Sequence, residues 1–168
     1  NSQVAVYLTY AAPRGHALID RALYLPKSWT DDPARCADAG IPDEQRGFAT
    51  KPTLAATLID RAVQAGVPAA WVAGDEVYGA DPRLRALVRS HDLGYVLAIA
   101  ANRRVPTHAG PIRVDALPAL ILTHAWQKHS AGAGAHGPRL YSWAWFRLLA
   151  EDDTDRGVHH LLIRRNDA

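Results

Sequence analysis

Cysteine is nearly absent from this sequence, and methionine is missing altogether. The single cysteine, Cys36, excludes an internal disulfide and a zinc site built from cysteines, and it predicts a reducing compartment. No basic cluster lies beside Cys36 in its Asp/Ala-rich segment, so we predict an inert thiol. No apolar run approaches the roughly 20 residues that a membrane-spanning helix needs. No signal peptide precedes the first predicted strand.

The start of the chain is also informative. Position 1 is not methionine, and an alternating apolar pattern begins almost at once. A native amino terminus usually has a start residue and some slack before the first element. We therefore expect an excised or truncated segment of a longer protein.

The composition is that of an ordinary globular protein. The 168 residues suffice for one domain with a hydrophobic core, and contents of 48% hydrophobic and 21% charged residues are typical. The net charge of +2 and the pI of about 8.9 permit a nucleic-acid partner without requiring one.

Residues 3–12 have the period of a strand, with Val4, Val6, Leu8 and Tyr10 on one face. Residues 16–25 can return as the antiparallel partner after a Pro-Arg-Gly turn. This pattern predicts an antiparallel hairpin. Asp20 is a candidate metal ligand there, although a strand acid at the surface is the commoner role. Residues 26–50 are polar and contain several prolines and glycines, which predicts a long loop with one helical turn near 33–39. Within residues 16–25, the second strand of the predicted hairpin, alternation places four side chains on one side of the sheet: Leu18, Asp20, Ala22 and Tyr24.

The middle of the chain alternates between helical and strand patterns. Residues 50–66 predict a helix that is capped by Thr50. The apolar run 69–73 predicts a buried central strand, a second helix starts at Asp81, and residues 93–100 predict another buried strand. This alternation is typical of an α/β layer, so the predicted fold class is α/β.

From Arg103 onward the pattern changes, because prolines and glycines interrupt it. Residues 131–137, AGAGAHG, predict a flexible loop. Two alternating runs, 139–147 and 158–164, predict a second hairpin, with an acidic turn at 151–157 between its strands.

Two acids, Asp75 and Glu76, follow the apolar run and Gly74. The carboxyl ends of strands in open α/β sheets border the ligand crevice, and carboxylates suit divalent cations. Such an acid also commonly caps the next helix or pairs with an arginine. Because adjacent strand residues point to opposite faces, we expect only one of the two acids to reach a metal. Asp75 is the predicted ligand.

Aromatic and cationic residues alternate in the predicted second hairpin. Tyr141, Trp143 and Trp145 share one face of a strand that has an arginine at each end. Such a strip is typical of proteins that stack aromatic rings on unpaired bases, and it is also what a strand uses to pack on its neighbour. Arginines elsewhere offer phosphate contacts, although each alone is an ordinary surface feature. The candidate DNA contacts are Arg103, Arg104, Arg139, Arg164 and Arg165.

The histidines do not form a recognisable metal motif, and we expect them to be solvated. His124, His129 and His136 are irregularly spaced, and the adjacent His159 and His160 would diverge on a strand. The sequence contains no G-x-S-x-G elbow and no Gly-rich phosphate loop.

Several phrases follow one another along the chain: QVAVYLTYAAPRGHALIDRALYLPKSW, GIPDE, FATKPTLAATLIDRAVQAGVPAAWVAGDEVYG, LRALVRSHDLGYVLAIAANRRV, GAHGPRLYSWAWF and HHLLIRRN. In the same order, they resemble phrases of DDE-type insertion-sequence transposases, the group described as DDE superfamily endonuclease. GDEVYG, residues 74–79, is the most telling part of the resemblance.

The resemblance implies a partial ribonuclease-H-like fold, a mixed sheet with flanking helices, over residues 1–102, and a β-rich insertion over 103–168. Members of the group cut and join DNA with an Asp-Asp-Glu triad and two Mg²⁺ or Mn²⁺ ions. GDEVYG resembles their second acidic motif, which makes Asp75 the middle triad residue. The first Asp would precede position 1 and the Glu would follow Ala168. The chain is then the central part of a catalytic domain, and we expect it to bind metal weakly and to cleave nothing alone.

The partners implied by the resemblance are DNA, as transposon ends and target, and further copies of the parent protein. The implied location is the cytoplasm, at the nucleoid when DNA is bound. Two other interpretations stay open: a non-catalytic DNA-binding or interaction module, and an unrelated hydrolase that uses Asp75 with a histidine.

Overall fold

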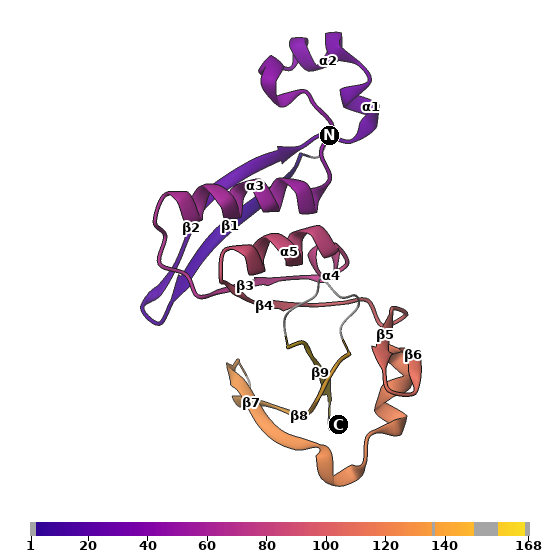
Figure 1. The fold of residues 1–168 in the computed structure, drawn as a ribbon. Coiled ribbons are helices and arrows are strands. Elements are labelled where there is room, and N and C mark those ends of the chain that lie inside the picture. Colours follow the sequence, from indigo (N-terminus) through magenta and orange to yellow (C-terminus); the bar gives the residue numbers. More distant parts are fainter. Residues whose placement is uncertain (1–2, 136, 150–157, 167–168) are drawn as a thin grey trace. The chain divides into compact units, whose positions relative to one another are not determined.

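The computed structural model describes residues 3–135, 137–149 and 158–166. The chain divides into two compact units, Asn1–Ile99 and Ala100–Ala168, which contain small sheets and helices (Figure 1). The fold class is therefore mixed α/β, as predicted, although the described strands form only two- and three-stranded sheets. Within the described ranges, no helix combines the length and the apolar character that crossing a membrane requires.

The predicted first hairpin is confirmed. β1 (Val4–Ala12) and β2 (Gly15–Tyr24) pair antiparallel, and Gly15 begins β2 with a φ of +143° that favours glycine. On β1, Val6 is only 3% exposed and belongs to the core of the first unit.

A β-bulge changes the second strand of this hairpin. Leu8 opposes Asp20, but the next residue, Thr9, opposes Leu18, so one residue of β2 has no partner across the ladder. An extra residue reverses the faces beyond it, which moves Leu18 to the side opposite Asp20. The prediction that Leu18 and Asp20 share one side is therefore wrong.

Residues 26–50 form short helices rather than one long loop. α2 (Pro33–Asp38) confirms the helical turn predicted near 33–39, whereas α1 (Lys27–Thr30) and the 3₁₀ helix η1 (Asp43–Gln45) were not predicted. The Cys36 thiol is fully buried and donates a hydrogen bond to the Trp29 carbonyl oxygen at 3.2 Å. The small cluster around it consists of Leu25, Trp29, Cys36 and Ile41.

The helix α3 (Lys51–Gln64) organises the core of the first unit. The Thr50 hydroxyl accepts a hydrogen bond from the Thr53 N–H at 3.3 Å, which confirms the predicted cap. One face of α3 packs against β1 and against α5 (Pro82–Ser90), whose predicted start at Asp81 is also confirmed. The core side chains are Val6, Ala55, Leu58, Ile59, Leu84 and Val88.

The two predicted central strands form a short parallel pair, β3 (Trp71–Gly74) and β4 (Gly94–Leu97). The expectation that they are buried is wrong, because Trp71 is 67% exposed and Val96 is 60% exposed. The physical reason is that the core covers only one face of the pair, which Val72 and Tyr95 contribute to it. Trp71 and Val96 lie on the opposite face, which stays exposed. A groove of about 230 Å³ is lined by residues of β1, α3 and β3, including Leu8, Ile59, Val63 and Val72.

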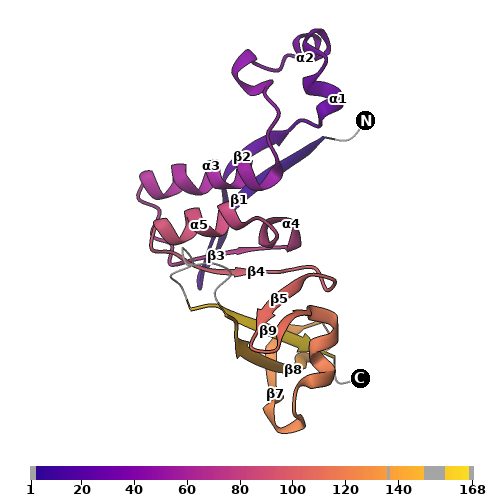
Figure 2. The same ribbon diagram turned by 45° about the vertical axis from the view of Figure 1, so that its right-hand side comes forward.

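The second unit is built from antiparallel strands (Figure 2). A hairpin and two 3₁₀ helices precede a three-stranded sheet of order β7–β8–β9. The elements are β5 (Arg104–Thr107), β6 (Gly110–Arg113), η2 (Val114–Leu120), η3 (Thr123–Ala125), β7 (Gln127–Gly134), β8 (Gly137–Arg147) and β9 (His160–Arg165).

The pairing of β8 with β9 confirms the predicted second hairpin. The flexible loop predicted at 131–137 is wrong for residues 131–134, which belong to β7. The glycines of this stretch favour a loop, but the strand continues through them. The pairing of β7 with β8 shifts by one residue between Ser130 and Ala133, and Gly132 adopts a φ of +91° at this bulge. The predicted acidic turn at 151–157 lies outside the described residues.

Candidate functional site

Asp75 follows β3 directly and caps α4 (Glu76–Gly79). Its Oδ1 accepts a hydrogen bond from the Val77 N–H at 2.9 Å, as aspartate does at helix starts. The residue is exposed, and among the described residues Oδ2 makes no hydrogen bond. One carboxylate oxygen is thus fixed by the backbone, while the other is open to a ligand.

Glu76 is the first residue of α4 and is also exposed. The expectation that both acids lie on the strand is wrong, because β3 ends at Gly74. Both acids lie at the carboxyl edge of the parallel β3–β4 pair, where the Ala98 N–H continues the ladder to the Gly74 carbonyl oxygen at 3.0 Å.

Two glycines allow α4 to pack tightly against the chain that leaves β4. A Cβ at Gly79 would lie 1.8 Å from the Ala98 carbonyl oxygen, far inside van der Waals contact. A Cβ at Gly74 would lie 3.1 Å from a methyl group of Leu97. The two glycines of GDEVYG therefore have a steric reason, and they hold Asp75 at this edge.

Tyr78 lies beside Asp75 in the same short helix. Burial raises the pKa of the Tyr78 phenol, and the negative charge of Asp75 raises it further. The phenol therefore stays neutral through the physiological pH range and can act as a hydrogen-bond donor near the carboxylate.

The described residues do not complete a metal site. No group of three His, Cys, Asp or Glu side chains among them is placed to hold an ion, and His136 is outside the described ranges. A pair of Mg²⁺ ions needs several carboxylates around ions roughly 3.5–4 Å apart. Asp75 fits the role of one ligand, but the described residues by themselves do not fit the ion pair. Asp20 has another function, since its Oδ2 forms an ion pair with Arg61 of α3 at 2.8 Å.

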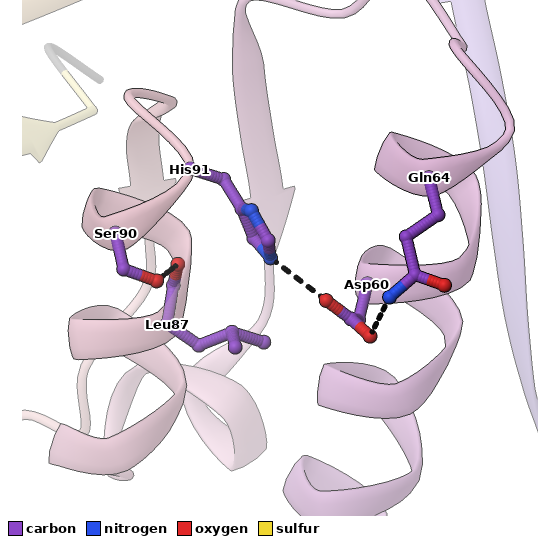
Figure 3. Close-up of polar contacts among 5 residues, drawn as sticks. All are labelled: Asp60, Gln64, Leu87, Ser90 and His91. Atoms are coloured by element: carbon purple, nitrogen blue, oxygen red, sulfur yellow. Dashed lines mark hydrogen bonds and ion pairs between the residues drawn. The ribbon is translucent and has the colours of Figure 1, made fainter.

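A polar contact that no sequence motif indicates joins α3 to the end of α5 (Figure 3). His91 Nε2 lies 3.0 Å from Asp60 Oδ1, and Gln64 Nε2 donates to Asp60 Oδ2 at 2.7 Å. His91 follows the last residue of α5, so this contact ties the two helices of the core. Residues 60 and 91 are far apart in the sequence and come together only in the fold, so no local motif predicts their contact.

The candidate DNA contacts lie at different places in the second unit. Arg104 donates to the Pro111 carbonyl oxygen at 3.0 Å across the β5–β6 hairpin, next to Arg103. Arg139 and Arg164 belong to one face of the β7–β8–β9 sheet, whereas Arg165 opposes Ser142 on the other face. Their role as phosphate contacts stays a prediction, as does the metal role of Asp75.

The described residues place no further layer over the aromatic strip of β8. Trp145 is 69% exposed, and Tyr141 and Trp143 are partly exposed. The other face of β8 is the buried one, with Ser142 at 8% and Ala144 at 4% exposure.

Comparison with known families gives a match over most of the chain. A family model described as DDE superfamily endonuclease matches residues 1–118, which include the first unit and GDEVYG. No curated protein and no solved structure matches the chain. Because the match extends over more than half of the 168 residues, the chain belongs to the DDE superfamily endonuclease family.

Proposed function

We propose that this chain is the central part of the catalytic domain of a DNA transposase, which cleaves and joins DNA strands with divalent metal ions. One observation carries the proposal. Within the family match, an exposed aspartate stands at the carboxyl edge of a parallel strand pair. Its carboxylate caps a short helix that ends in Gly79, where a Cβ would clash with the Ala98 carbonyl oxygen.

Asp75 is the proposed metal ligand, and Mg²⁺ or Mn²⁺ is the proposed cofactor. When bound, such ions activate a water or hydroxyl nucleophile and stabilise the leaving oxygen. The chain contributes orientation, because the Val77 N–H fixes one oxygen of the Asp75 carboxylate at 2.9 Å. Further carboxylates would come from the rest of the parent protein, and for that reason we expect this segment to bind metal weakly and to be inactive alone.

The proposed fold of the catalytic domain is ribonuclease-H-like. The hairpin β1–β2 and the parallel pair β3–β4 contribute residues, with α3, to one core and to one groove. An extended strand in that groove would join the two small sheets into one mixed sheet. In this proposal residues 1–102 belong to the incomplete core, and residues 103–168 belong to a β-rich insertion.

DNA is the proposed partner, as transposon end and as target, and the parent protein is proposed to self-associate on it. Membership of a DDE endonuclease family supports a DNA substrate. The net charge of +2 is compatible with this partner. A protein with this role would work at the nucleoid.

Nicking of supercoiled plasmid in the intact parent protein tests the proposal. Asp75→Asn and Asp75→Ala should abolish nicking in Mg²⁺ and in Mn²⁺ while DNA binding in chelator stays at the parent level. Glu76→Gln is the matched control and should retain nicking. Metal-dependent nicking by Asp75→Asn at the parent rate would end the assignment.

A second candidate function is a non-catalytic DNA-binding module. It is favoured by the lack of a three-ligand metal cluster among the described residues. Such a module would bind DNA with a steep salt dependence and would not cut it under any metal condition, even within the intact parent.

A further inference from the structure

One face of the β7–β8–β9 sheet carries no acidic side chain along the described strands. Strand alternation and the pairing of Trp143 with Arg164 and of Trp145 with Leu162 define the face. The pairing of Tyr141 with His129 extends it to β7. We call it the aromatic face. Its members are Gln127, His129, Arg139, Tyr141, Trp143, Trp145, Arg147, His160, Leu162 and Arg164.

The aromatic face is the exposed side of the sheet. Eight of its ten members are exposed, and the other two, Tyr141 and Trp143, are partly exposed. The opposite face holds the buried residues Ser142, Ala144 and Leu161. The sheet thus packs one face, where Phe146 and Ile163 are also partly buried, and leaves a row of large aromatic rings on the other face in contact with solvent. Such an exposed aromatic patch favours a partner on the aromatic face.

The rings on this face lie among cations at contact distance. The Arg164 guanidinium lies 4.5 Å from the Tyr141 ring centre and 6.0 Å from that of Trp143. Trp145 and His160 stack with ring centres 5.2 Å apart and planes 26° apart. Contacts of this kind hold the rings in fixed positions while one side of Trp145 stays open, since that residue is 69% exposed.

The charge of the face has one sign. Arg139, Arg147 and Arg164 are always protonated, and no carboxylate of the three strands opposes them on this side. Arg139 uses one N–H to reach the Ala131 carbonyl oxygen at 2.8 Å, which leaves other guanidinium donors for a ligand. Exposed aromatic rings bordered by guanidinium groups are complementary to a nucleic-acid strand, which carries both planar bases and phosphates.

We propose that the aromatic face binds single-stranded DNA, with Trp145 and Trp143 stacking on unpaired bases and the three arginines contacting phosphates. The choice of DNA as partner rests on the proposed function, whereas the stacking chemistry rests on the sheet alone. Duplex DNA is the poorer ligand, because its bases already stack on one another and present no free ring faces. The family match ends at residue 118, so it assigns no role to this sheet.

Binding of a fluorescent oligo-dT of about 12 nucleotides to the full chain in chelator tests the inference. We expect quenching of tryptophan fluorescence and a clear preference over the matched duplex. Trp145→Ala should weaken binding about 5- to 150-fold, the usual effect of removing one stacked ring. Trp71→Ala is the matched control, because Trp71 is similarly exposed at 67% but lies in the first unit, and it should bind like the unmodified chain.

Salt dependence tests the arginine part of the inference. Three phosphate contacts predict a slope of about −2 for log K against log salt concentration, and Arg164→Ala should reduce its magnitude by about 0.7. Circular dichroism and the melting temperature check that each variant is folded.

Three results would overturn the inference: equal affinity for oligo-dT and duplex, unchanged binding by folded Trp145→Ala, or a dimer of the chain that Trp145→Ala dissociates. The dimer would show that a second copy covers the face. The two readouts fail independently. Metal-dependent nicking by Asp75→Asn at the parent rate would end the proposed function without touching this inference, whereas equal affinity for oligo-dT and duplex would end this inference without touching the proposed function.

Discussion

Gly79→Ala tests whether the tight packing of α4 is what positions Asp75. The added methyl group would lie 1.8 Å from the Ala98 carbonyl oxygen, and real Cβ atoms essentially never approach other heavy atoms closer than 3.0 Å. α4 and the chain after β4 must therefore separate by more than 1 Å. The obstacle is backbone rather than a flexible side chain, so no rotamer change relieves it.

The expected cost follows from this geometry. Forcing an extra methyl group into a packed site costs about 1–3 kcal/mol, and a clash with backbone belongs at the upper end. Alanine is a better helix former than glycine by at most about 1 kcal/mol, which offsets part of the cost. We expect a net loss of about 2 kcal/mol in the free energy of unfolding.

Urea unfolding, followed by far-ultraviolet circular dichroism, measures this loss. Gly47→Ala is the matched control, because a Cβ there meets nothing within 4 Å and Gly47 has no positive φ. The control should be unchanged or more stable by up to about 1 kcal/mol. If Gly79→Ala unfolds within about 0.5 kcal/mol of the unmodified chain, the close approach to Ala98 is not a constraint and the steric argument for GDEVYG is refuted.

Three further predictions concern the first unit. Asp75→Ala should cost about 1 kcal/mol by removing the cap on Val77, whereas Asp75→Asn keeps it; urea midpoints that fall equally would contradict the capping role. The pKa of Tyr78 should fall toward 10.0 in Asp75→Asn, as measured by tyrosinate absorbance against Tyr78→Phe; an unchanged value would mean that the two groups do not interact. Since this pKa is raised on folding, its stabilising effect is complete below pH 10.0 and is lost as the pH rises through the folded value. The contact between Asp60 and His91 should couple by about 0.5–1 kcal/mol in a double-mutant cycle, and additive losses would argue against it.

Local chemistry explains which parts of the fold could be predicted. Thr50 and Asp81 cap helices because their side chains accept hydrogen bonds from the N–H groups of the first turn, and this signal is contained in a few adjacent residues. The antiparallel hairpin at the start follows from alternation in the same way. The bulge that reverses Leu18 could not be predicted, since it depends on which residues pair across two strands.

Burial of β3 was predicted wrongly for a related reason. An apolar run predicts that a strand will be covered, but whether it is covered depends on strands and helices elsewhere. Trp71 is exposed because it lies on the face of the β3–β4 pair opposite the one that packs against the core through Val72 and Tyr95. The same reasoning applies to Trp145. Alternating aromatic residues occur both in strands that pack on a neighbouring layer and in strands whose aromatic face is exposed to a ligand. The burial of the opposite face, where Ala144 is only 4% exposed, assigns the aromatic side to solvent, and that burial depends on residues elsewhere in the chain.

The sequence predicted where Asp75 lies in the fold, but not the contacts around its carboxylate. Asp75 was selected as an acid at the end of a strand, and it does follow β3. Its hydrogen bond to Val77 and the helical placement of Glu76 depend on the turn into α4, which the apolar run conceals. The contact of His91 with Asp60 could not be predicted, because the two residues are far apart in the sequence.

Mn²⁺ titration of the isotope-labelled chain, followed by nuclear magnetic resonance, tests the central claim most directly, because weak binding still broadens amide signals near the ion. The account predicts selective broadening at residues 74–77 that disappears in Asp75→Asn and persists in Glu76→Gln. Broadening centred on other acids, or the same broadening in Asp75→Asn, would contradict the claim that Asp75 is a metal ligand.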